Sequence, residues 1–316
     1  MRIIYLGSGE FGVPSLNALA DSSHSVELVV TQPARAAGRG KRKCATAVAG
    51  WAKKHHIKCV EAENVNSAEM IELLREAKPD LFVVIAFGQK IGREVIELAP
   101  HEAINVHASL LPKYRGAAPI NWAIINGEKQ TGISIITLAE KMDAGAVLAE
   151  AETGINIDET AGELHDRLAE LAGPVLVETI GKIADDTAAY HVQEESQVTI
   201  APKLKKSDGY IDFAEPAETV RNKIHGLWPW PGATVLYVSQ KGKALRVSIA
   251  AADMVRMDNP GGIGHGTIDE NLNVICGEHR LQIMRVKPEG SKLMNFADFV
   301  NGRRVTPGDK FVRIQE

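Results

Sequence analysis

The sequence predicts an α/β protein of two domains, in which a Rossmann-like, doubly wound and mostly parallel sheet precedes a smaller, OB-like β-barrel. Its 316 residues suit two domains better than one. Short apolar runs alternate with helical patterns over the first two-thirds, as is typical of a doubly wound sheet. From Tyr210 onward, short strands between glycine-rich turns favour a small barrel. We therefore expect domains at 1–188 and 208–316, joined by a linker at 189–207.

Five apolar runs predict the strands of the first domain. Several are apolar at successive positions, as expected for strands that are buried on both faces of a sheet. The predicted strands are RIIYL (2–6), SVELVV (25–30), DLFVVIAF (80–87), EAINVH (102–107) and GISIIT (132–137).

Three other segments of this domain have helical patterns. The segment 13–22 carries a proline in its first turn, where the missing N–H is tolerated. The segment 66–78 begins at a capping residue and repeats apolar side chains at helical spacing. A long helical stretch at 159–185 closes the domain, and we expect Gly173-Pro174 to kink or divide it.

The C-terminal part begins with a predicted helix at 216–227 and continues as short strands. Turn-forming residues separate these strands at regular spacing, which indicates an all-β unit. The predicted strands are 233–239, 244–250, 266–269, 271–277 and 280–286.

Composition restricts the classes of protein that fit this chain. No run of eighteen apolar residues predicts a membrane span, and no charged-then-apolar signal pattern opens the sequence. Three widely spaced cysteines form neither a metal-ligand spacing nor a disulfide framework, which favours a reducing cytoplasm. The net charge is -4, but residues 205–316 carry 16 basic and 13 acidic side chains. This mildly basic part is either ordinary scatter or a surface for an anionic partner.

The glycine loop LGSGEFG (6–12) matches the spacing of a dinucleotide fingerprint. Such a site expects an acidic residue at the end of the second strand, where this chain has Thr31 and Gln32. Arg35 is placed to meet a 2′-phosphate, so NADP stays open as an alternative. We favour the structural interpretation, in which the glycines let the first turn pack tightly and no NAD is bound.

Two polar side chains stand at the end of an otherwise apolar predicted strand. Asn105 and His107 are two positions apart and so point to the same face. They lie at the carboxyl end, where open α/β sheets bind ligands. Asp143, in the loop segment MDAG (142–145), is a candidate to orient the imidazole. The alternative is a hydrogen-bonded core pair with a turn-forming aspartate. Asn105, His107 and Asp143 are called the polar trio below.

The polar trio, together with SLLP (109–112) and RG (115–116), resembles the active-site signature of the formyltransferase family that uses 10-formyltetrahydrofolate. The resemblance implies that Asn105, His107 and Asp143 are catalytic, and that neither a metal nor NAD takes part. It assigns to the folate site Ser109, Leu110, Leu111 and Pro112.

Three further segments resemble the branch of this family that acts on methionyl-tRNA: 31–48, 199–213 and IHGLWPWPGA (224–233). The resemblance implies transfer of the formyl group to the α-amine of methionine on initiator tRNA. A basic loop such as GRGKRK is otherwise an ordinary solvated surface. The side chains expected to bind tRNA are Arg39, Lys41, Arg42, Lys43, Lys203, Lys205 and Lys206.

Other functions share some of these features. A formyl-folate hydrolase, or a formyltransferase for a sugar-nucleotide amine, would keep the polar trio but has no need of the basic loop. An NAD(P) oxidoreductase would need the glycine loop to bind pyrophosphate, and a purely RNA-binding protein would need no polar trio. The sequence favours a cytoplasmic monomer that acts on charged initiator tRNA without a membrane partner.

Overall fold

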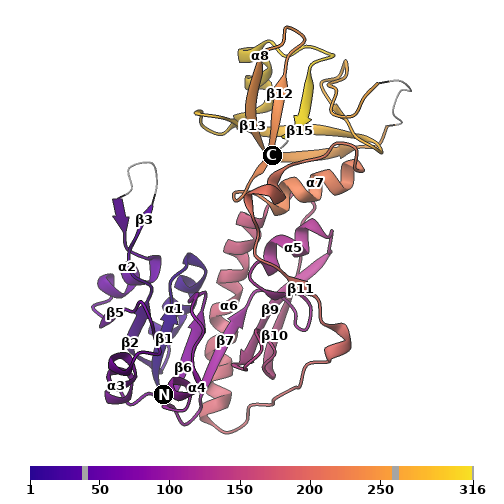
Figure 1. Ribbon diagram of the computed structural model, residues 1–316. Coiled ribbons are helices and arrows are strands. Elements are labelled where there is room, and N and C mark those ends of the chain that lie inside the picture. The colour runs from indigo at the N-terminus through magenta and orange to yellow at the C-terminus, as the bar shows by residue number, and fades with distance from the viewer. Residues whose placement is uncertain (38–41, 258–262, 315–316) are drawn as a thin grey trace. The chain divides into compact units, whose positions relative to one another are not determined.

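The computed structural model describes residues 1–37, 42–257 and 263–314, and the chain divides into two compact units (Figure 1). The first unit comprises Met1–Arg115, Gly132–Thr153 and His165–Ile200. The second comprises Gly116–Thr131, Gly154–Leu164 and Ala201–Glu316. Each unit therefore contains segments that are far apart in the sequence.

A seven-stranded sheet forms the first unit, in the order β10-β9-β7-β6-β1-β2-β5. The pairs β1–β2, β1–β6, β6–β7 and β2–β5 are parallel, whereas β7–β9 is antiparallel, which confirms the mostly parallel sheet. Strand order reverses between β1 and β6, and in such folds ligands bind beyond the carboxyl ends of the strands near that point. The strands are β1 (Arg2–Gly7), β2 (Ser25–Thr31), β5 (Cys59–Glu61), β6 (Leu81–Ile85), β7 (Ala103–His107), β9 (Gln130–Thr137) and β10 (Val147–Gly154).

All five strands predicted for this sheet are present, and the strands that the prediction missed have a weaker apolar pattern. β5 is only three residues long, and β10 alternates buried and exposed residues, as edge strands do. A separate hairpin of β3 (Arg35–Ala37) and β4 (Arg42–Cys44) lies within the segment 31–48. A search for continuous apolar runs overlooks such strands.

The predicted helices are present as α1 (Val13–Ala20), α3 (Ala68–Glu76) and α6 (Ala161–Ala184), with α2 (Ala47–Lys54) and the short α4 (Arg93–Ile96) in addition. A proline lies in the first turn of α1, and the Ser67 hydroxyl caps α3 by accepting a hydrogen bond from Met70 N at 3.3 Å.

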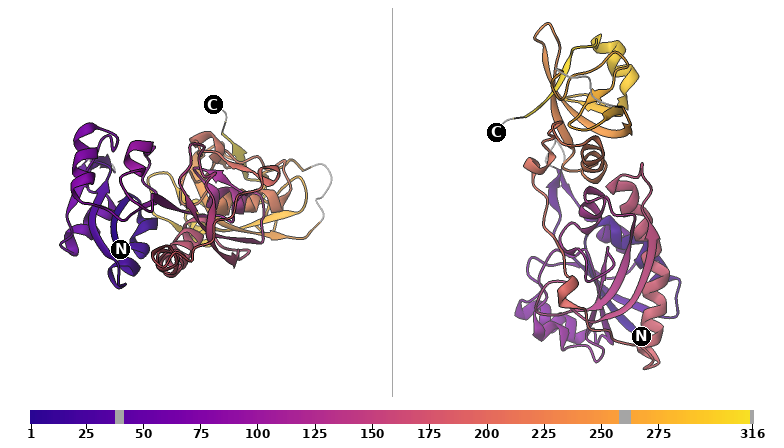
Figure 2. Two further views of the ribbon diagram at one scale, coloured as in Figure 1. Left: turned by 90° about the horizontal axis from the view of Figure 1, so that it is seen from below. Right: turned by 90° about the vertical axis from the view of Figure 1, so that its right-hand side faces the viewer.

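Of the two outcomes predicted for Gly173-Pro174, a kink or a division, the division was wrong, because α6 is one 24-residue helix with Pro174 inside it (Figure 2). An internal proline costs a helix about 3 kcal/mol. Each fully buried leucine or isoleucine contributes roughly 1.5–3 kcal/mol, and Leu168, Leu176 and Ile180 are all 0% exposed. Burial of this apolar stripe outweighs the proline. Gly173 assists, since a Cβ there would lie 3.1 Å from Ala18 Cβ on α1.

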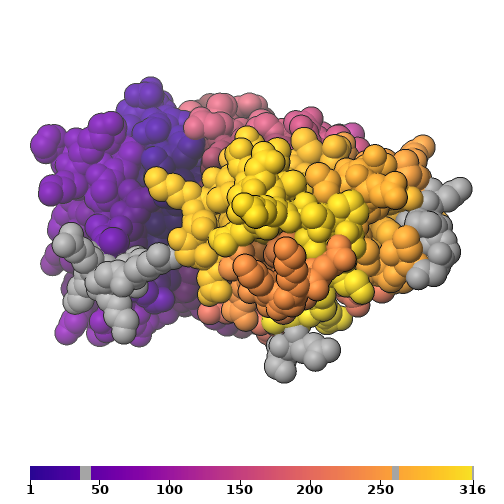
Figure 3. Space-filling model, turned by 90° about the horizontal axis from the view of Figure 1, so that it is seen from above, coloured from indigo at the N-terminus to yellow at the C-terminus, as the bar shows by residue number. Residues whose placement is uncertain are grey.

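The second unit is built on a six-stranded antiparallel sheet in the order β14-β15-β13-β12-β17, with β16 paired to β15 (Figure 1). Figure 3 shows the surface formed by the C-terminal residues, which are drawn in orange and yellow. The segment 267–268 bridges both edges, because Thr267 pairs with Lys310 of β17 and Ile268 with Val274 of β14. These bridges close the predicted barrel. The strands are β12 (Ala233–Val238), β13 (Ala244–Val255), β14 (Val274–Ile275), β15 (Arg280–Pro288), β16 (Met294–Asn295) and β17 (Lys310–Arg313).

The barrel strands differ in length from the prediction. The predicted strand 266–269 contributes only isolated bridges, and 271–277 is reduced to β14. The helices of this unit are α5 (Pro119–Ile125), α7 (Ala217–Gly226) and α8 (Phe296–Arg303). A two-stranded ribbon pairs β8 (Arg115–Gly116) with β11 (Ile200–Ala201). Among the residues that the structure describes, no helix combines the length and apolar character needed to cross a membrane.

His225 of α7 is a buried titratable group that joins this helix to the barrel. It is 3% exposed, and its Nε2 accepts a hydrogen bond from Ala252 N of β13 at 3.2 Å. Burial lowers the pKa of His225, and the neighbouring Arg221 lowers it further. The folded protein therefore holds this imidazole neutral.

We predict that His225 makes the protein less stable as the pH falls below about 6.5, the ordinary pKa of histidine. In that range the unfolded chain binds a proton that the folded chain does not, so the free energy of unfolding falls, by at most about 1.4 kcal/mol per pH unit. Urea unfolding between pH 7.5 and 5.5 should show a steeper loss for the wild type than for His225→Gln. Equal slopes would contradict this prediction.

Candidate active site

β7 brings two members of the polar trio to the carboxyl end of the sheet. In the strand register Asn105 lies beside Val84 of β6 and Ile136 of β9, and His107 lies opposite Ser134 of β9. His107 is the last residue of the strand and is 6% exposed, whereas Asn105 is partly exposed. Both stand at the edge where a sheet of this kind binds its ligand.

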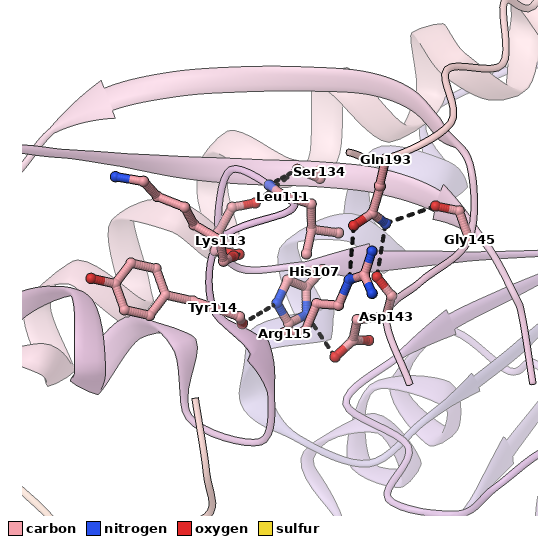
Figure 4. Close-up of polar contacts among 10 residues, drawn as sticks. His107, Leu111, Lys113, Tyr114, Arg115, Ser134, Asp143, Gly145 and Gln193 are labelled. Carbon is pink, nitrogen blue, oxygen red and sulfur yellow. Dashed lines mark hydrogen bonds and ion pairs between the residues drawn. The ribbon is translucent and has the colours of Figure 1, made fainter. Parts of the chain in front are cut away.

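Both ring nitrogens of His107 face polar groups of the first unit (Figure 4). Nε2 lies 2.9 Å from the carbonyl oxygen of Tyr114, and a carbonyl only accepts hydrogen bonds. Nε2 therefore carries a proton and donates it. Nδ1 lies 3.6 Å from Oδ2 of Asp143, whose side chain is 14% exposed. The structure thus brings His107 and Asp143 together, and a second proton on Nδ1 would form an ion pair with the carboxylate.

The two groups that face His107 both come from residues in left-handed backbone. Tyr114 has φ 63° and Asp143 has φ 54°. That conformation costs a residue with a side chain about 1–2 kcal/mol, although aspartate tolerates it better than most. Such strain persists only where surrounding contacts hold it. Tyr114 was not identified by the sequence, because its contribution is a backbone carbonyl that no side-chain motif reveals.

The Asn105 side chain differs from that of His107 in its hydrogen bonding. Within the described part of the chain, no hydrogen bond reaches its amide group, which is partly exposed at the end of β7. A side-chain amide offers two donors and one acceptor. The amide N–H groups of Asn105 therefore remain available to donate hydrogen bonds to a ligand at this end of β7.

The predicted folate loop SLLP (109–112) is anchored by one hydroxyl of β9. Ser134 Oγ accepts a hydrogen bond from Leu111 N at 3.0 Å and donates to Ser109 O at 2.8 Å. Leu111 is buried in an apolar cluster with Ile136 and Val147. Ser109 is also buried, and its hydroxyl donates to Lys113 O at 2.7 Å. Of the four predicted residues, Leu110 and Pro112 are the more accessible.

The predicted tRNA-binding residues fall into three groups. Arg39 and Lys41 lie outside the described residues. Arg42 and Lys43 lie on β4, where the backbone pairs with β3. The linker lysines Lys203, Lys205 and Lys206 are all exposed.

The glycine loop packs against Tyr5 of β1. A Cβ at Gly12 would overlap the Tyr5 hydroxyl, and one at Gly7 would lie 2.6 Å from the ring. The hydroxyl itself donates to Gly12 O at 3.1 Å. At the end of β2, Gln32 Nε2 donates to Phe87 O at 2.8 Å. Close packing thus accounts for these glycines. No group of three or more potential metal ligands is gathered within the described residues.

This fold and site belong to a known class of enzyme. A family model described as "Formyl transferase" matches residues 1–180, and one described as "Formyl transferase, C-terminal domain" matches residues 203–304. The chain therefore belongs to the formyl transferase family.

Within the family, the full-length similarity is to methionyl-tRNA formyltransferases. The protein of that name from Acetivibrio thermocellus is 41% identical over 309 residues, which cover 98% of this chain and 99% of that protein. Its namesake from Solibacter usitatus is 40% identical over 315 residues and 98% of each chain. The solved N-formyltransferase from Helicobacter canadensis shares the fold, with a TM-score of 0.62 and 17% identity over 90% of this chain and 98% of that one.

We predict that Ser134→Ala lowers the free energy of unfolding by about 1–3 kcal/mol, because it leaves buried backbone groups of the loop without a partner. Chemical denaturation measures the change. The matched control is Ser196→Ala, since Ser196 is exposed and donates only to Glu194. An equal effect of the two substitutions would show that Ser134 does not anchor the loop.

Proposed function

We propose that this enzyme transfers the formyl group of 10-formyltetrahydrofolate to the α-amine of methionine on initiator tRNA. The observation that carries this proposal is the approach of His107 and Asp143 at the carboxyl end of β7. The same face of β7 carries Asn105, whose amide has no hydrogen-bond partner within the described residues. The full-length similarity to methionyl-tRNA formyltransferases supports this acceptor over water or a sugar-nucleotide amine. Neighbours in fold, described as complexes with folinic acid and tetrahydrofolic acid, support a folate donor.

In the proposed reaction the methionyl amine attacks the formyl carbon and charge develops on the formyl oxygen. Asn105 donates a hydrogen bond to that oxygen from its amide. His107 donates from Nδ1, because Nε2 is already bound to Tyr114 O and Asp143 Oδ2 lies 3.6 Å from Nδ1, beyond hydrogen-bond distance. One such donor is worth about 3–4 kcal/mol of transition-state stabilisation. The Asp143 carboxylate stabilises the imidazolium that this donation requires.

Collapse of the tetrahedral intermediate breaks the bond between the formyl carbon and N10 of the folate. The attacking amine loses a proton and N10 gains one, so the step needs a group that moves a proton across the site. We assign this role to Asp143, directly or through a water molecule, and such catalysis contributes roughly 10²–10⁴-fold. The products are formylmethionyl-tRNA and tetrahydrofolate.

The proposal extends to the folate site, the domains and the tRNA contacts. The loop 109–112 lines the folate site, with Leu110 and Pro112 as its accessible side chains. The domain 1–188 carries out the chemistry, and the linker and domain 208–316 bind tRNA. The seven basic side chains named above contact tRNA phosphates. The enzyme acts as a cytoplasmic monomer without a metal or NAD, a proposal that rests on the sequence alone.

The direct experiment supplies formyl-labelled 10-formyltetrahydrofolate and methionine-charged initiator tRNA, and counts label in the precipitated RNA. We expect label that depends on charging, with uncharged tRNA as the control. At low tRNA concentration the rate should fall steeply with added salt, because phosphate contacts release counterions. Deformylation of the folate without labelled RNA would contradict the proposed acceptor.

We predict that His107→Ala and Asp143→Asn each lower kcat by at least roughly 100-fold while the fold is retained, because each removes stabilisation of the transition state. Steady-state kinetics and circular dichroism measure both properties. Asp166→Asn is the matched control, since Asp166 pairs with His165 at 2.9 Å and is 83% exposed. Near wild-type turnover in either site variant would exclude these roles.

A further inference from the structure

The segment predicted as a linker contributes a buried side chain to the site. Gln193 is 8% exposed, and both ends of its amide are used. Nε2 donates to Asp143 O at 2.8 Å and to Gly145 O at 2.7 Å. Oε1 accepts a hydrogen bond from Arg115 Nε at 2.9 Å. Gln193 thus links the loop that carries Asp143 to Arg115, the residue after Tyr114.

These contacts close a ring around the imidazole (Figure 4). His107 Nε2 donates to Tyr114 O, and Arg115 follows Tyr114 in the chain. Arg115 donates to Gln193, and Gln193 donates to Asp143 O. The Asp143 carboxylate then faces His107 Nδ1 at 3.6 Å. Without Gln193 the ring is open, and Asp143 loses a restraint that connects it to the other side of the imidazole.

The same segment also holds the Tyr114 side of the ring. Thr199 Oγ1 accepts a hydrogen bond from Tyr114 N at 2.8 Å, and Thr199 O accepts one from Arg115 N at 2.9 Å. Residues 193–199 therefore contact both Tyr114 and Asp143, the two residues in left-handed backbone that direct a polar group toward His107. Left-handed backbone at residues other than glycine is maintained only when surrounding contacts determine it.

The single amide of Gln193 meets all three contacts at this position. The position needs an acceptor for the buried Arg115 Nε and a donor for two carbonyl groups, and an amide has both. Glutamate would keep the acceptor but lose the donors. Glu195 also contacts the Arg115 guanidinium, but its side chain is 67% exposed and therefore holds the guanidinium weakly.

We propose that Gln193 is a positioning residue, which holds the Asp143 carboxylate against His107 for formyl transfer. This inference rests on the proposed function, since Asp143 and His107 are catalytic only there. Gln193 touches neither reactant. It acts through the Asp143 carbonyl, and its loss lets the carboxylate move away from the imidazole.

The test is Gln193→Glu, which keeps the Arg115 contact and removes both donated hydrogen bonds. We expect kcat to fall by about 10- to 100-fold with little change in KM for either substrate, because a displacement of about 1 Å costs that much. Gln197→Glu is the matched control, since Gln197 is exposed on the same segment and donates only to Glu194. Wild-type kcat in Gln193→Glu would overturn the inference.

A second substitution separates positioning from a general structural role. In an Asp143→Asn background, Gln193→Glu should cause little further loss, because residues that act through one another are not additive. A loss by the same factor in both backgrounds would overturn the inference. If Gln193→Glu does not fold, Gln193→Met, which is similar in length and lacks both amide functions, is measured in the same two backgrounds.

Hydrogen exchange tests the contacts of Gln193 without the formyl acceptor, methionine-charged tRNA. Amides of the loop 141–146 should exchange faster in Gln193→Glu than in Gln197→Glu, and equal exchange would overturn the inference. If the wild type fails to label charged tRNA, the proposed function fails, while the exchange rates still decide whether Gln193 holds the loop.

Discussion

The hydrogen bond from His107 Nε2 to the Tyr114 carbonyl is the interaction on which the geometry of the site depends. It commits one ring nitrogen to the protein backbone and so turns the other toward Asp143. An imidazole that is 6% exposed needs such partners, because a buried polar group without one costs about 1–3 kcal/mol. The same bond decides the chemistry, since the nitrogen that remains can donate only as part of an imidazolium, which the carboxylate of Asp143 stabilises.

The fold supplies the position at which this bond is useful. β7 ends at His107, one strand away from the point between β1 and β6 where strand order reverses, so two side chains of one strand reach the ligand-binding edge together. One of them is satisfied by the protein, whereas Asn105 has no hydrogen bond to its amide within the residues described. The His107 imidazole, held by a hydrogen bond, and the Asn105 amide, with N–H donors still available, therefore lie on the same face of β7. That contrast suits a site in which charge develops on a bound oxygen.

The sequence predicted the sheet, the barrel and the meeting of His107 with Asp143, because those features follow from local patterns and a short motif. It did not predict Gln193, which contacts Arg115 across 78 positions and Asp143 across 50, within a segment interpreted as an irregular linker. No periodicity marks a residue whose contacts are to distant backbone. The sequence left open whether Pro174 kinks or divides α6, because the local rule about proline does not include the tertiary burial that keeps the helix continuous. Arg39 and Lys41, which the sequence predicts to bind tRNA, lie outside the described residues.

The most direct test of this account is the protonation of His107, read by nitrogen NMR of protein labelled with ¹⁵N-histidine. A His107→Gln variant identifies the resonances. We expect Nε2 to carry a proton throughout the pH range in which the protein is folded, whether or not Nδ1 is also protonated, because Tyr114 O only accepts. A neutral imidazole protonated at Nδ1 alone would contradict it, since the bond to Tyr114 could not then exist.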